Sequence, residues 1–470
     1  MRFTAVLILT MFFSATGFSA EPEPELNNST LIAKLHFDRS ARKGQMVGAL
    51  QIRIRNASTK PLTSLSLLLN PGLQFVRVEG SGRKQLEVTS DIKAIEGSNL
   101  LELNAATVQF TNPLAPSKQR EIVIHFRGYI EDLSWTGLDG IKETLHPDFA
   151  MIRAQSFAYP IFATPDMASI QRAWNSKPYQ QIVFLEMPGG NTVRGSLAVA
   201  EKTIAGSKTN YELKSARLTK PAVVAIGNYA DLTDGMISVS RLNATEAEAR
   251  AVLDAANAYS GKVRGLIGAP GKTGSISIIE VPDGYRDMVT TGAIFRGPSF
   301  FANPEISADI QAEIFELWRL NTRNQAGHWS TGFDTLTKEF LSNGGTMQGY
   351  NDAAFLAAQP LFALNKNLGK AALADYAVDG YTGQSDTVST LAFAVLYNVL
   401  GDEAFFALLR NLRSELANNY ADMEAVAEFL SGAVKHKKAR KFVKNWFAKG
   451  RAGKDMAKAK SFDALVTLYK

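Results

Sequence analysis

The spacing of apolar residues changes once along the 470-residue chain, and this change constrains the fold more than any other feature of the sequence. From about 31 to 226, apolar and polar residues alternate, as at Leu50, Ile52 and Ile54, which is typical of strands with one buried face. From Thr245 onward the spacing is that of amphipathic helices, and this threonine is a suitable N-cap for the first of them. The pattern therefore predicts a β domain followed by a mostly helical domain.

We place the boundary between these domains at 226–245. This gives an N-terminal β-sandwich-like domain over 21–230 and an α+β domain over 231–470, in line with the two or three domains expected of a chain this long. In the second domain a β-branched run at 274–282 predicts a strand. Helices are predicted at 307–320, 389–400, 403–418, 423–432 and 439–449.

The first 20 residues have the pattern of a secretory signal. Arg2 supplies the positive end, residues 5–13 form a short apolar core, and the small residues from Ser14 to Ala20 suit cleavage. The apolar run is about half of the roughly 20 residues that a membrane span needs, and no later segment is apolar enough. We therefore expect a periplasmic or secreted protein that has no transmembrane anchor after cleavage.

The residue types that bind transition metals are scarce in this chain. There is no cysteine, which excludes a disulfide framework, a thiolate metal site and a cysteine nucleophile. A catalytic zinc usually has three protein ligands and one open position. The chain has five histidines, and no two of them are close enough in sequence to share one helical face: His36, His125, His146, His328 and His436.

Short motifs in the second half follow a defined order. A long helix and a strand precede the loop Gly292-Ala-Ile-Phe-Arg-Gly-Pro298. The helical segment Ala312-Glu-Ile-Phe-Glu-Leu-Trp318 comes next, and then Trp329-Ser-Thr-Gly-Phe333. Two further helices over 386–410 complete the order. This order of motifs resembles that of the aminopeptidase N family, whose members are zinc peptidases of the gluzincin, thermolysin-like type.

The resemblance implies a thermolysin-like fold for the second half and the family's N-terminal β domain for the first. It also implies positions for the family's site residues. The two ligating histidines of the H-E-x-x-H motif fall at Ala312 and Glu316, and the third ligand falls at Thr331. The general base of the motif is retained as Glu313, and the tryptophan that often follows is retained as Trp318.

Other positions of the family's site are also changed. The glutamate of the family's loop falls at Phe295, and the catalytic tyrosine falls at Asp386, or at Tyr381 if the gap is placed differently. The methyl group of Ala312 cannot bind a metal. Without a bound metal, water is not acidified, and Glu313 has no activated nucleophile to generate. The resemblance thus predicts the fold and, at the same time, the loss of zinc and of activity.

Two side-chain clusters near this motif each have two interpretations. Asp309, Glu313 and Glu316 share one helical face, and such oxygen ligands suit a hard cation such as Ca²⁺. A solvated acidic face is the favoured interpretation. The aromatic residues of this region form either core or a peptide-binding groove, and core is favoured. They are Tyr285, Phe295, Phe300, Phe301, Trp318 and Phe333.

The C-terminal segment 431–470 is strongly basic. It holds 12 Lys and Arg against 2 Asp and Glu, in a chain whose formal net charge is +6. Such a segment is a candidate for binding nucleic acid or an anionic membrane surface. Export argues against nucleic acid, and the apolar residues interleaved with the lysines favour the solvated face of amphipathic helices.

Our leading hypothesis is a catalytically inactive, zinc-independent relative of the family that binds a peptide or an envelope protein. The former cleft would be formed by Gly292, Ala293, Phe295, Trp318 and Tyr381. One alternative is an active hydrolase with displaced zinc ligands, namely Glu313 and Glu316 with His328 or Asp334. Another is a structural or assembly role of the β domain. We expect no cofactor and no nucleic-acid partner. The sequence does not decide whether the chain is an enzyme, although a non-enzyme is favoured. It also leaves the oligomeric state open.

Overall fold

The computed structural model describes residues 24–38, 43–98, 100–135, 138–142, 144–174, 176–215, 218–270, 274–320, 329–376, 379–416 and 421–470. The predicted signal at 1–20 lies outside these residues. The chain divides into two compact units, Met1–Asn228 and Tyr229–Lys470, which are described separately. Among the residues described, no helix is both long and apolar enough to span a lipid bilayer.

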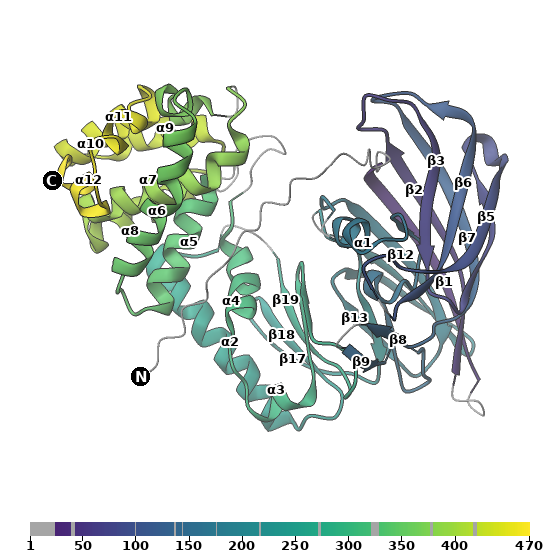
Figure 1. Cartoon of the computed structure of the whole chain (residues 1–470). Coiled ribbons are helices and arrows are strands. Elements are labelled where there is room, and N and C mark those ends of the chain that lie inside the picture. Colours follow the sequence, from purple (N-terminus) through teal and green to yellow (C-terminus); the bar gives the residue numbers. More distant parts are fainter. Residues whose placement is uncertain are drawn as a thin grey trace. The chain divides into compact units, whose positions relative to one another are not determined.

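The first unit is built on a large, mostly antiparallel sheet of 11 strands (Figure 1). Their order is β11-β3-β6-β5-β4-β7-β2-β1-β12-β15-β14, and β1 pairs with β12 in parallel. The strands are β1 (Glu25–Asp38), β2 (Lys43–Arg55), β3 (Leu62–Leu69), β4 (Leu73–Glu79), β5 (Gln85–Ala94), β6 (Glu102–Leu114), β7 (Gln119–Tyr129), β11 (Ile161–Phe162), β12 (Gln180–Pro188), β14 (Ala198–Ala205) and β15 (Lys208–Lys214).

The predicted alternation is present in this sheet. Along β2 every second side chain is buried, including Leu50, Ile52 and Ile54, and these side chains contribute to the core of the unit. Smaller elements accompany the sheet. They are a three-stranded sheet of β10 (Phe149–Ile152), β16 (Val224–Gly227) and β13 (Thr192–Gly195), the hairpin of β8 (Leu133–Trp135) and β9 (Leu138–Ile141), and helix α1 (Met167–Trp174). The prediction of a β domain in this half is confirmed.

The second unit begins with a five-stranded sheet, ordered β17-β18-β19-β21-β20. Its strands are β17 (Ala230–Asp234), β18 (Ile237–Arg241), β19 (Ile276–Glu280), β20 (Met288–Thr290) and β21 (Ala293–Arg296). Helix α2 (Glu246–Ile267) packs on this sheet, and it begins at the predicted cap. The Thr245 hydroxyl accepts a hydrogen bond from the Glu248 N–H, while the Glu248 carboxylate accepts one from the Thr245 N–H.

Helices make up the rest of the second unit (Figure 1). They are α3 (Pro298–Ala302), α4 (Ala308–Phe315), α5 (Trp329–Ser342), α6 (Gln348–Leu364), α7 (Ser385–Leu400), α8 (Asp402–Leu416), α9 (Met423–Ala433), α10 (Lys437–Val443), the π-helical turn Lys444–Ala448, α11 (Ala452–Met456) and α12 (Phe462–Thr467). The helices predicted at 389–400, 403–418, 423–432 and 439–449 are present with shifted ends. The helix predicted at 307–320 ends early, at Phe315, and α5 and α6 were not predicted.

Helix α7 lies at the centre of this unit, and most of its side chains are buried. Helix α5 packs directly against it, at Gly332 of the Trp329–Phe333 motif. A Cβ at Gly332 would lie 2.6 Å from the backbone carbon and oxygen of Ser389. The absence of a side chain at Gly332 therefore allows the close approach of α5 to α7.

Candidate functional site

The segment that matches the metal-binding helix is the end of a short helix. Ala312 lies in the last turn of α4, which ends at Phe315 and continues as a 3₁₀ turn over Glu316–Trp318. The side chain of Ala312 is a methyl group, which cannot bind a metal. The Glu316 carboxylate forms an ion pair with Arg319, with 3.0 Å between Oε1 and Nη1. Neither Ala312 nor Glu316 therefore offers zinc the free nitrogen that a histidine ligand would offer.

Glu313, the retained general-base position, is buried, with only 9% of its surface exposed. Its carboxylate accepts a short hydrogen bond from the backbone N–H of Gly292. Gly292 has a φ of 79°, in the left-handed region that favours glycine, and it leads into β21. The structure thus brings together two residues of the predicted site, Glu313 and Gly292, and the contact holds the turn before β21 against α4.

The three carboxylates of α4 and its end have separate partners. Asp309 contacts Arg296 and Ser307, and these hydrogen bonds outweigh the opposing effect of burial, so that the pKa of Asp309 lies below its ordinary value. In the described part of the chain, no group of three or more His, Cys, Asp or Glu residues is placed to hold a metal ion. The interpretation of these three carboxylates as a calcium site therefore has no support in that part of the chain. The alternative, a solvated acidic face, is wrong for Glu313 because this residue is buried.

The proposed cleft residues lie mostly in the interior. Ala293, Phe295 and Trp318 are 0% exposed, and the Trp318 indole N–H donates to the carbonyl of Gly268 at 2.8 Å. These three side chains offer no surface to a peptide, which corrects the prediction that they line a cleft. Phe301 and Phe333 are also buried, while Tyr285 and Phe300 are half-buried, so the core interpretation describes the aromatic set better.

Tyr381, the other candidate for the catalytic tyrosine, is half-buried and packs on Tyr376 with 5.7 Å between ring centroids. Asp386 lies in the first turn of α7. Thr331, the position of the third ligand, lies in the first turn of α5 and is half-buried. Its hydroxyl is a poor replacement for the carboxylate that zinc sites of this type use. The side chains at 312, 316 and 331 therefore do not form a ligand set that fits a zinc ion.

A buried ion pair lies close to this region. Asp334 on α5 and Arg413 on α8 are 5% and 6% exposed, with 3.7 Å between Oδ1 and Nη1. This distance is too long for a hydrogen bond, and none of the three guanidinium nitrogens has a hydrogen-bond partner among the described residues. Burial raises the pKa of Asp334 to about 6 in spite of the attraction of Arg413, and burial lowers the pKa of Arg413 to about 10.

Sequence reasoning named Asp334 as a possible displaced ligand and missed Arg413. A signal for Arg413 was present, because helical periodicity places it on the apolar face of α8 with Leu409 and Leu416. The other displaced ligand considered, His328, lies outside the described residues. The remaining histidines are scattered, with His36 on β1, His125 on β7, His146 after β9 and His436 at the N-cap of α10.

The basic C-terminal helices are amphipathic, as predicted. Their lysines and arginines are exposed, whereas the apolar side chains between them are buried, namely Phe442, Val443, Trp446 and Phe447. A buried carboxylate connects these helices, because Asp455 accepts hydrogen bonds from the Trp446 indole at 3.0 Å and from the Tyr469 hydroxyl at 2.5 Å.

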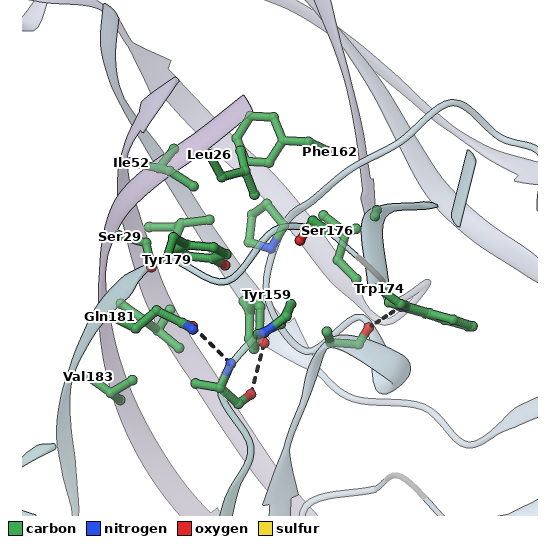
Figure 2. Close-up of a pocket in the computed structure, with 18 of the residues that line it drawn as sticks. Leu26, Ser29, Ile52, Tyr159, Phe162, Trp174, Ser176, Tyr179, Gln181 and Val183 are labelled. Atoms are coloured by element: carbon green, nitrogen blue, oxygen red, sulfur yellow. Dashed lines mark hydrogen bonds between the residues drawn. The ribbon is translucent and has the colours of Figure 1, made fainter. Parts of the chain in front are cut away.

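The first unit contains a cavity of about 70 Å³ that the sequence did not suggest (Figure 2). Strands β1, β2 and β12, which are neighbours in the sheet, form one wall. The opposite wall comes from the segment around β11 and from the end of α1, including Phe162 and Trp174. The lining is drawn from segments far apart in sequence, so no local motif marks it.

No protein-family model matches the chain, and no curated protein matches it. Among solved structures, it is similar to a mutant M1 zinc metallopeptidase from Deinococcus radiodurans bound to a Tyr-Ser-Ala substrate, with 14% identity over 91% of this chain and 95% of that chain and a TM-score of 0.45. A two-domain M1 zinc metallopeptidase bound to L-arginine is 12% identical over 90% and 94%, with a TM-score of 0.46. Native yeast LTA4 hydrolase is 14% identical over 91% of this chain and 68% of its own, with a TM-score of 0.48. At these values the likeness indicates nothing about what this chain binds or does.

Proposed function

We propose that this protein is an exported, non-catalytic relative of the aminopeptidase N-type zinc peptidases, which works without zinc and binds a peptide or an envelope protein. The order of motifs from the Gly292 loop to the helices over 386–410 supports the family relationship. The absence of a fitting ligand set at Ala312, Glu316 and Thr331 supports the loss of metal chemistry.

The contact between Glu313 and Gly292 is the observation that carries the proposal. A general base must have its carboxylate within reach of the water that it activates. In this chain the Glu313 carboxylate is buried and accepts a hydrogen bond from the backbone of the neighbouring loop. Glu313 therefore has a structural role, which explains why a glutamate is useful at this position without a metal.

Binding without cleavage needs an accessible surface near this loop. Ala293, Phe295 and Trp318 are buried, which leaves Gly292 and Tyr381 as the partly exposed members of the predicted set. A peptide that adopts an extended conformation uses backbone hydrogen bonds as much as side-chain pockets. Nucleic acid is a poorer partner, because the aromatic residues of the basic helices are buried and offer no bases a stacking surface.

The test combines metal content with activity. The full chain, purified without chelator, is analysed for zinc by elemental analysis and assayed with a panel of fluorogenic aminoacyl substrates with and without chelator. We expect well under one zinc per chain, and hydrolysis no greater than that of the Glu313→Gln variant. Glu305→Gln, a change at an exposed neighbouring carboxylate, is the matched control.

One zinc per chain together with chelator-sensitive hydrolysis that Glu313→Gln abolishes and Glu305→Gln preserves would overturn the proposal. That result would instead support the hydrolase with displaced ligands. Binding is tested separately with an immobilised library of extended peptides and the same variants.

A further inference from the structure

We infer that the exposed side of helix α6, together with the basic residues beyond its C-terminus, is a binding surface for an anionic lipid bilayer. In this arrangement the apolar side chains of α6 enter the interfacial region of the bilayer, and the neighbouring cations bind phosphate head groups. The inference is independent of the proposed function, which concerns the loop at Gly292. It rests on an unpartnered apolar helix face and on a cluster of exposed cations at one end of it.

Helix α6 is apolar on two opposite sides. One side is buried in the unit and contains Ala354, Phe355, Ala358 and Phe362. The other side is exposed and contains Ala353, Leu356, Ala357, Pro360 and Leu364, whose spacings of three and four residues place them on one face. Leu356 is 63% exposed and Leu364 is 88% exposed. A helix that is apolar all round is normally buried on every side, so this exposed face indicates an interaction surface.

Two lysines follow directly after this face. Residues 353–374 contain no Asp or Glu, and their only charged residues are Lys366 and Lys370, which are both exposed. The chain turns tightly here, because the Asn365 side-chain oxygen accepts hydrogen bonds from the backbone N–H groups of residues 367 and 368, each at 3.1 Å. The two lysines are therefore close to the Leu364 end of the helix.

The basic C-terminal segment supplies further cations at the same place. Helix α6 packs against α11 and α12, which are drawn in yellow in Figure 1. A Cβ at Gly369 would lie 2.7 Å from the Cα of Gly453, and a Cβ at Gly450 would collide with the Lys370 carbonyl. These backbone contacts bring the neighbours of the two C-terminal glycines next to Lys370. The exposed cations among them are Lys449, Arg451 and Lys454.

The carboxylate nearest in sequence to these cations is not exposed. Asp455 is the single acidic residue in 444–458, and it is 5% exposed. It accepts hydrogen bonds from the Trp446 indole and from the Tyr469 hydroxyl. The cluster thus presents cations beside an apolar helix face. A bilayer with anionic lipids matches both features, because it offers phosphates to the cations and hydrocarbon to the leucines.

The experiment measures binding of the full chain to lipid vesicles by flotation. Vesicles of phosphatidylcholine with about one third phosphatidylglycerol are compared with vesicles of phosphatidylcholine alone. We expect the protein to bind the anionic vesicles more strongly, and we expect this difference to shrink as the salt concentration is raised above about 0.15 M. Each variant is also made in the full chain, so that the apolar residues 5–13 contribute equally to every measurement.

Two double variants separate the apolar and the electrostatic contributions. Leu356→Gln with Leu364→Gln should weaken binding to anionic vesicles by about tenfold or more, because two leucines no longer enter the bilayer. Lys370→Gln with Lys454→Gln should weaken it by about twentyfold at low salt, since each lysine near an anionic surface contributes about fivefold. Leu100→Gln and Lys262→Gln, at exposed positions elsewhere, are the matched controls and should bind as the wild type does.

Insertion is tested with Leu364→Trp and lipids brominated on their acyl chains, which quench a tryptophan that enters the bilayer. Trp318, Trp329 and Trp446 of the second unit are buried, so we expect more quenching in the variant than in the wild type. The inference is wrong if this extra quenching is absent, or if the leucine or the lysine double variant binds anionic vesicles as the wild type does.

A second copy of the chain is the competing occupant of this face. Sedimentation velocity of the wild type and of the leucine double variant tests for it. A dimer that dissociates in the variant, while vesicle binding stays unchanged, would overturn the inference. Circular dichroism shows whether each variant is folded, which we expect because the substituted side chains are exposed.

Discussion

Replacing Arg413 by methionine removes the cation that faces the buried carboxylate of Asp334. Both side chains are about 95% buried, and no hydrogen bond joins them. Removing one partner of a buried ion pair typically costs about 3–5 kcal/mol, because the other charge is left unpaired in a poorly solvated site. We expect Arg413→Met to lower the free energy of unfolding of the second unit by about this amount at pH 7.5.

The stability of the second unit should depend on pH, because the pKa of Asp334 is raised by burial. A shift from 3.8 to about 6 means that the ionised carboxylate costs the folded state about 3 kcal/mol above pH 6. The folded state binds this proton more tightly than the unfolded state, so this cost falls as the pH drops from about 6 towards 3.8. At pH 5 the wild type therefore regains part of this stability. Without Arg413 the pKa of Asp334 rises further, so Arg413→Met is expected to be less destabilising at pH 5 than at pH 7.5.

Urea unfolding followed by tryptophan emission measures these effects, because Trp318, Trp329 and Trp446 are all buried in the second unit. The double variant Asp334→Asn with Arg413→Met carries no charge at either position and should recover most of the lost stability. Arg410→Met, an exposed position on the same helix, should change stability by less than about 1 kcal/mol. An equal loss at both pH values, or a double variant as unstable as the single one, would refute this account.

Three further substitutions test other contacts. Glu313→Ala should leave aminopeptidase activity at background and destabilise the second unit by about 1.5–3 kcal/mol in urea unfolding, since a charged acceptor of the Gly292 N–H is lost. Glu280→Gln should lower the free energy of unfolding by a similar amount, about 1.5–3 kcal/mol. The fully buried Glu280 carboxylate accepts hydrogen bonds from three consecutive backbone N–H groups before α2, and hydrogen exchange of those amides should accelerate in the variant. Gly332→Ala should lower the free energy of unfolding by about 1–3 kcal/mol, because the added methyl group separates α5 from α7. A decrease in melting temperature smaller than that caused by Gly349→Ala, at an exposed glycine, would contradict this.

Local sequence patterns predicted much of the secondary structure. Alternation identified the large sheet because strands such as β2 and β12 bury one face. The first long helix was placed by Thr245, because capping depends on residues within one turn. The helices from α7 to α10 were found from their apolar periodicity. Helix α5 was not predicted, although Trp329, Phe333 and Leu336 follow helical spacing in it. Helix α6 contains Pro360, a residue that disfavours a helix interior, and it forms where the chain packs against α7.

The sequence by itself determined which chemistry is unavailable, because the residue types at 312, 316 and 331 are fixed whatever the fold does. Only the tertiary structure decided what the retained residues contact. It buried Trp318 and Phe295, placed the Glu313 carboxylate on the Gly292 backbone, and set Arg413 opposite Asp334. It also formed the cavity of the first unit from separate strands and loops. Residue identity sets what a side chain can do, whereas burial and neighbours depend on contacts between segments far apart in the chain.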